Sequence, residues 1–170
     1  MTEQAEDNGI VVGVDGSEAS LAALRWAEGQ ARALRTRVVA VHVWEPAAAR
    51  LAPYAPAAAR PTPEEEREQA AGVLAAAVRE VFGPREATAV RAVVAQGPPA
   101  RVLLRYADGA LLLALGRKAH RQWEAPAVGA VGHACLRHAT VPVVTVPAAE
   151  RSEPALRSVE APGRVHSGAA

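Results

Sequence analysis

The chain has 170 residues, half of them hydrophobic, a net charge of +1 and one cysteine, Cys135. This length suits a single domain, and the near-neutral charge gives no reason to expect nucleic acid binding. One cysteine excludes a disulfide framework and a cysteine-based zinc site. The N-terminus lacks the apolar core of a signal peptide, and no apolar run approaches the roughly 20 residues of a membrane span. We therefore expect a soluble, cytoplasmic protein that does not bind a membrane.

Apolar runs and helical spacing predict nine elements in alternation. Short apolar runs predict strands buried on both faces at residues 10–14, 38–43, 87–95, 110–115 and 141–146. Apolar residues at helical spacing predict helices at residues 19–35, 63–82, 99–106 and 129–138. The second helix has a capping-box start, with Thr62 as the cap and Glu65 three residues later, and it stops at Gly83 and Pro84.

The alternation predicts an α/β fold, a doubly wound sheet with helices on both faces. Its domain should span residues 9–147, after a flexible N-terminus at 1–8 and before a disordered tail at 148–170. Residues 45–61 are rich in Pro and Ala and predict an irregular excursion from the domain.

A ligand crevice is expected where the strand order reverses, beyond the carboxyl ends of the strands. Three loops compete for that position: residues 15–17, the residues after Val43, and residues 116–129. The last loop follows a strand, holds several basic side chains and leads into a helix that opens at Gly129. Because a helix N-terminus attracts anions, this stretch predicts a phosphate site. A solvated polar loop explains the same residues, so both interpretations stay open.

The chain resembles the universal stress protein family over about residues 9–147. Five segments recur in the family's order and spacing: residues 10–20, 41–43, 97–100, 115–116 and 141–146. The resemblance implies an adenine-nucleotide alpha-hydrolase-like fold, a five-stranded parallel sheet in the order 3-2-1-4-5. It also implies a homodimer paired through the last strand, between Val143 and Val146.

ATP-binding members of that family carry Gly, two residues, Gly, nine residues, Gly, then Ser or Thr. Placed on this chain without a gap, the pattern puts Gly116 first and Gly129 third. Ala119 stands where the second glycine belongs, and Ala130 stands at the Ser/Thr position. The spacing is therefore kept while two of the four residue types are lost.

The same correspondence implies roles for residues outside the loop. Asp15 would face the adenosine, Val43 the adenine edge through its backbone, and Leu115 the base. A cap for the following helix is the competing explanation of Asp15, as it is of Ser17. The candidate nucleotide-contacting residues are then Asp15, Val43, Leu115, Gly116, Lys118, Ala119, Gly129, Ala130 and Val131.

The two alanines should weaken phosphate binding. A second glycine with positive φ would make alanine there unfavourable by about 1 kcal/mol or more. Ala130 removes a hydroxyl donor to phosphate, worth roughly 1.5–3 kcal/mol. Together the loss is on the order of 2–4 kcal/mol, or about 30- to 1000-fold in affinity.

No residue pattern predicts catalysis. The chain has no Gly-x-Ser-x-Gly elbow and no Gly-Lys-Ser/Thr loop. His133 and His138 are five residues apart on a helix and cannot share a metal ion. His42 should be a packed, hydrogen-bonded residue of a strand, and Cys135 a buried thiol. We expect no catalytic residue, no metal site and no required cofactor.

Three hypotheses remain. The first is a dimeric regulatory or interaction module of the stress response with an unidentified protein partner and a degenerate, weak or absent nucleotide pocket. The second is an ATP- or AMP-binding stress sensor that uses residues 116–129. The third is a slow nucleotide hydrolase. The two alanines favour the first.

Overall fold

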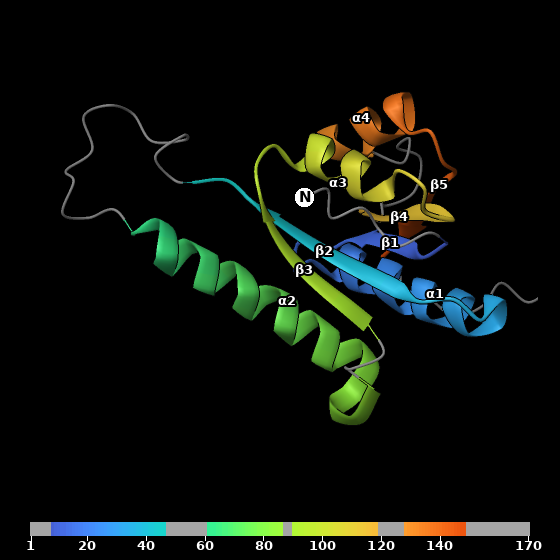
Figure 1. The fold of residues 1–170 in the computed structure, drawn as a ribbon, viewed down its shortest axis with the longest axis horizontal. Helices are drawn as coiled ribbons and strands as arrows, with labels where there is room; N and C mark the ends of the chain where they lie inside the picture. Colours follow the sequence, from blue (N-terminus) through green and yellow to red (C-terminus); the bar gives the residue numbers. More distant parts are fainter. Residues whose placement is uncertain (1–7, 47–60, 87–89, 119–127, 149–170) are drawn as a thin grey trace, which may run out of the picture.

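A parallel sheet of five strands forms the centre of the protein (Figure 1). The computed structural model describes residues 8–46, 61–86, 90–118 and 128–148. The strand order is β3-β2-β1-β4-β5, as the resemblance implies, so the predicted doubly wound fold is confirmed. The strands are β1 (Ile10–Gly13), β2 (Val38–Trp44), β3 (Val90–Gln96), β4 (Leu112–Arg117) and β5 (Val143–Pro147).

Helices cover both faces of the sheet. Since side chains alternate along a strand, Val12 and Ala40 pack on one face with α1 (Glu18–Leu34) and α2 (Pro63–Glu86). Val11 and Val39 pack on the other with α3 (Pro99–Ala107) and α4 (Ala130–His138). Figure 1 shows α3 and α4 on one side of the sheet and α1 on the other. The fold therefore has three layers and two separate hydrophobic cores.

The start of α2 is the predicted capping box. The Thr62 N–H donates to Glu65 Oε2 at 2.7 Å, and the Glu65 N–H donates to Thr62 Oγ1 at 3.2 Å. Hydrogen bonding to the carboxylate by the Thr62 backbone N–H, and then by the Thr62 side chain, lowers the pKa of Glu65. Near the other end, Gly83 has φ 71° and interrupts the regular helix at the predicted stop, but a short helical segment continues to Glu86, four residues beyond the predicted end.

All five strands differ from their predicted ranges by one to three residues, and the largest differences are in β3, β4 and β5. β4 runs two residues further, to Arg117, because it pairs with β5 as far as Pro147. β5 begins at Val143 rather than at 141, although the Pro142 carbonyl already accepts from the Leu113 N–H at 2.9 Å. β3 runs from Val90 to Gln96, and the predicted residues 87–89 lie outside the described part of the chain.

The three segments predicted to flank or leave the domain lie mostly outside the described residues. These are the predicted segments 1–8, 45–61 and 148–170. At the last boundary the Ala148 N–H donates to the Arg117 carbonyl at 3.0 Å, so the backbone beyond β5 still bonds to β4. In the described ranges, no helix combines the length and apolar character that crossing a membrane requires.

Candidate functional site

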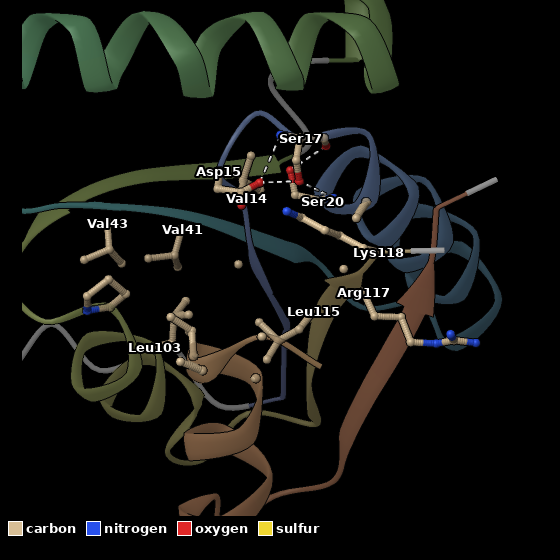
Figure 2. A pocket seen from close by; sticks show the side chains of 18 residues that line it. Val14, Asp15, Ser17, Ser20, Val41, Val43, Leu103, Leu115, Arg117 and Lys118 are labelled. Atoms are coloured by element: carbon tan, nitrogen blue, oxygen red, sulfur yellow. Dashed lines mark hydrogen bonds between the residues drawn. The ribbon is translucent and has the colours of Figure 1, made fainter. Parts of the chain in front are cut away.

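A cavity of about 620 Å³ opens at the carboxyl ends of β1, β2 and β4 (Figure 2). This is where the strand order reverses and where doubly wound folds bind ligands. Hydrophobic residues form one wall, while an acidic turn, a basic strand end and a helix N-terminus form the rest. The lining residues are Gly13, Val14, Asp15, Ser17, Ala19, Ser20, Val41, Val43, Pro99, Leu103, Leu115, Gly116, Arg117, Lys118, Gly129, Ala130, Val131 and Gly132.

The structure brings eight of the nine candidate residues to this cavity. They are Asp15, Val43, Leu115, Gly116, Lys118, Gly129, Ala130 and Val131. The ninth, Ala119, lies outside the described residues. Sequence reasoning did not select the apolar wall of Val41, Pro99 and Leu103, whose residue types are those of an ordinary core. The position of Val41 could have been predicted from the sequence. It lies two residues before Val43, so its side chain is on the same face of β2.

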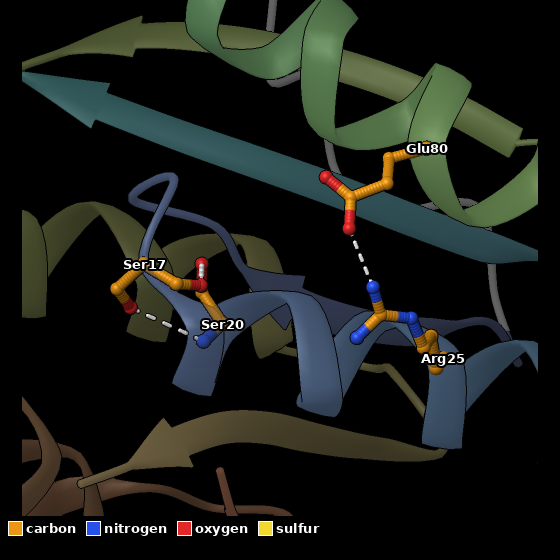
Figure 3. A network of polar contacts seen from close by, with 4 residues as sticks. All are labelled: Ser17, Ser20, Arg25 and Glu80. Atoms are coloured by element: carbon orange, nitrogen blue, oxygen red, sulfur yellow. Dashed lines mark hydrogen bonds and ion pairs between the residues drawn. The ribbon is translucent and has the colours of Figure 1, made fainter. Parts of the chain in front are cut away.

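The acidic turn is tied to the start of α1. Ser17 is the N-cap of α1, and its hydroxyl oxygen accepts from the Ser20 N–H at 3.2 Å (Figure 3). Asp15 Oδ1 in turn accepts from the Ser17 N–H at 2.9 Å and from the Ser17 hydroxyl at 2.6 Å. Asp15 therefore lines the cavity and also supports the cap. Further along α1, Arg25 forms an exposed ion pair with Glu80 of α2 (Figure 3).

These contacts favour the ionised form of Asp15. Partial desolvation by the cavity wall raises the pKa of its carboxyl, but the hydrogen bonds from Ser17 and Ser20 outweigh this, and the pKa is lowered overall. Asp15 is thus a carboxylate at neutral pH and can accept from a ligand's hydroxyl or amino group.

The lowered pKa of Asp15 predicts a pH-dependent stability. A carboxyl whose pKa is lower in the folded chain stabilises the fold above its unfolded pKa and loses that contribution as the pH falls. Asp15→Asn should lower the unfolding free energy at pH 7, because it removes the charge that the hydrogen bonds stabilise. The loss should be only about 1 kcal/mol, because water screens an exposed carboxylate. The difference from wild type should shrink below about pH 4. Urea unfolding at a series of pH values measures it, with Asp108→Asn as control; a difference independent of pH would contradict the role of the charge.

Two cations follow one another at the end of β4 but point differently. In Figure 2 the Lys118 side chain extends across the cavity toward Asp15 and Ser20, whereas the Arg117 guanidinium points away from them. Lys118 thus places a positive charge within the cavity on a flexible stem, suited to an anionic group.

The start of α4 adds a second feature that attracts anions. Gly129 is the N-cap, without a side-chain hydrogen bond, and its carbonyl accepts from the His133 N–H at 2.9 Å. The N–H groups of the first turn have no acceptor within the helix and carry the positive end of its dipole. Ala130 is the first helical residue, so its side chain contributes a methyl group and no donor.

The histidines and the cysteine do not join this site. His133 and His138 are exposed on α4. Cys135 is fully buried, and burial raises the pKa of its thiol, which makes it unreactive. Within the described ranges, no three His, Cys, Asp or Glu side chains lie together in a way that could hold a metal ion.

The fold and the cavity define a doubly wound α/β protein with a crevice at its switch point. Residues 8–147 match the universal stress protein family. Because this match covers most of the chain, the protein belongs to that family. A search of curated proteins finds no match.

Solved structures agree with the family and the fold. A universal stress protein family member from Burkholderia pseudomallei is 26% identical, with a TM-score of 0.60, over 82% of this chain and 95% of its own. Universal stress protein UspA from Lactobacillus plantarum is 21% identical, with a TM-score of 0.60, over 84% and 99%. The universal stress protein from Archaeoglobus fulgidus in complex with dAMP is 21% identical, with a TM-score of 0.59, over 86% and 99%.

Proposed function

We propose that this protein is a dimeric regulatory or interaction module of the stress response whose adenine-nucleotide pocket is degenerate and binds weakly. One observation supports this most. The cavity has the size and walls of a ligand site, yet the first residue of α4, the helix whose N-terminus lines it, is Ala130, which has no hydroxyl group. The phosphate side of the cavity therefore has backbone donors and one ammonium group, but no hydroxyl from that position.

The class of ligand follows from the chemistry of the walls. Val41, Val43 and Leu115 offer an apolar surface for a flat base, and the Asp15 carboxylate can accept from a ribose hydroxyl or an exocyclic amino group. The Archaeoglobus fulgidus relative, which has the same fold, is in complex with dAMP. An adenine nucleotide is the ligand we propose, with its phosphates directed to Lys118 and the start of α4.

A methyl group at Gly129 tests this placement. Apart from Gly129 and its two neighbours in the chain, no described atom lies within 4 Å of the position of an added Cβ, and φ is −61°, which any residue adopts. Gly129→Ala should change the unfolding free energy by less than about 1 kcal/mol. It should weaken nucleotide binding about tenfold or more, because the methyl group would take up space at the phosphate side of the cavity, which Gly129 lines.

Chemical-shift titration with AMP and ATP measures this loss even at millimolar affinity. Gly72→Ala is the matched control, because its added Cβ also meets no described atom and it lies on α2, away from the cavity. Equal affinities for wild type and Gly129→Ala would refute the placement of the phosphates.

A nucleotide sensor is the second candidate, and Lys118 favours it. Its ammonium group reaches into the cavity and could compensate in part for the missing hydroxyl (Figure 2). In that case ATP or AMP would occupy the pocket and change the binding of a partner. We propose no catalytic role; nucleotide hydrolysis above a no-enzyme control, abolished by Asp15→Ala, would be needed to assign one.

The homodimer is proposed through β5. This strand pairs with β4 on one side, and among the described residues no strand pairs with its other edge. Such an edge tends to be covered or paired, which supports a two-fold contact through Val143–Pro147. Sedimentation equilibrium at tens of micromolar protein should give a dimer, and a monomer at that concentration would contradict the proposal.

A further inference from the structure

The carbonyl of Val14 is buried at a point where the sheet no longer provides it with a partner from a strand. β1 ends at Gly13, while β2 continues to Trp44 beside β3. The Val14 N–H still donates to the Val41 carbonyl at 2.9 Å. Val14 is only 3% exposed, so its own carbonyl needs a hydrogen-bond donor from the protein.

His42 provides that donor through its side chain. Its Nδ1 lies 2.7 Å from the Val14 oxygen. A carbonyl oxygen can only accept, so Nδ1 must carry the hydrogen of this bond. Because side chains alternate along β2, His42 lies on the opposite face from Val41 and Val43, which line the cavity. The His42 side chain therefore lies on the face of the sheet opposite to that of Val41 and Val43, and His42 does not line the cavity.

The residue after Val14 begins the acidic turn. Gly16 has φ 81°, and a Cβ there would lie 2.9 Å from Val73 of α2, so the turn is closely packed against that helix. Ser17 then binds the Asp15 carboxylate and caps α1. The turn is therefore fixed at its middle by α2 and at its end by α1, and the bond from His42 is a side-chain contact at its start.

We propose that His42 is a positioning residue, which holds the Val14 carbonyl through Nδ1–H and thereby fixes the turn that presents the Asp15 carboxylate to the cavity. The use of that carboxylate by a nucleoside rests on the proposed function, whereas the positioning itself does not.

The tautomer of His42 in the wild-type protein is the first test. A long-range ¹H–¹⁵N spectrum of the imidazole groups at pH 8 should show Nδ1 of His42 protonated and Nε2 unprotonated. Free neutral imidazole side chains favour the other tautomer, so this result is diagnostic. Protonation at Nε2 alone would overturn the proposal without any variant being made.

A matched pair of variants tests the consequence for Asp15. In His42→Asn the amide nitrogen stands as far along the side chain as Nδ1 and still donates, while His42→Leu has similar bulk and no donor. A carboxyl ¹³C titration should show the pKa of Asp15 rising toward its ordinary value in His42→Leu and staying low in His42→Asn. An unchanged pKa in His42→Leu, or an equal rise in both variants, would overturn the proposal.

The inference can be tested even if one variant does not fold or no nucleotide binds. Should His42→Leu fail to fold, the wild-type tautomer and the pKa of Asp15 in His42→Asn still test the role of His42. Titration of the folded variants with AMP should show about tenfold weaker binding for His42→Leu than for His42→Asn. If AMP does not bind wild type at all, the nucleotide proposal fails, while the tautomer and the pKa of Asp15 still test the role of His42.

Discussion

Gly116→Ala should lower the free energy of unfolding by about 3 kcal/mol or more, near or beyond the upper end for overpacking. A Cβ on Gly116 would lie 2.2 Å from the carbonyl carbon of Ala19, 2.3 Å from its oxygen and 2.6 Å from the Ser20 nitrogen. These are backbone atoms in the first turn of α1, so no side-chain rotation can relieve the contact. β4 and α1 would have to separate at the edge of the cavity.

Urea unfolding of Gly116→Ala and Gly129→Ala compares two glycines of the same sequence motif. We expect a large loss for the first and almost none for the second, because an added Cβ at Gly129 meets no described atom. Similar losses for both would mean that the close contact between β4 and α1 is wrong. The expected result would show that packing requires Gly116 whether or not a nucleotide binds.

The largest expected gain of function comes from restoring both lost motif residues. Ala119→Gly with Ala130→Ser should tighten ATP binding about 30- to 1000-fold, which is on the order of 2–4 kcal/mol. Ala130 opens α4 beside Lys118 and Gly129 at the cavity, so a serine hydroxyl there can donate to a phosphate. Ala119 enters through the sequence motif alone, since it lies outside the described residues.

Fluorescence titration with a labelled ATP analogue measures this gain. Ala134→Ser, one turn further along α4 and away from the cavity, is the control for adding a hydroxyl to this helix. No gain in the double variant would mean that the family's motif does not align with residues 116–130 as placed.

The fold was largely predictable because its signals are local. Apolar runs marked the strands, the Thr62–Glu65 box marked the start of α2, and Gly83 marked the break near its end. The strand order required the family resemblance, since no single segment encodes its neighbours. The strand ends were less accurate because pairing sets them: Arg117 belongs to β4 only through its partner Pro147.

The site was predictable where residue type and spacing indicate chemistry, as at Asp15 and Gly129. Its apolar wall was not, because Leu103 and Val41 are ordinary core residues until the fold brings them beside Leu115. The contact of His42 with Val14 joins residues 28 apart in the chain and leaves no local pattern. Sequence alone also could not show that Gly116 is required by α1.

The affinity of the unmodified protein for ATP tests most directly whether its pocket is degenerate. Isothermal titration calorimetry of the full chain, with and without Mg²⁺, should give a dissociation constant well above about 50 µM. Such a value would fit a cavity that has kept its walls, with Ala130 at its phosphate side. A constant below about 50 µM would contradict the degenerate pocket and favour the nucleotide sensor.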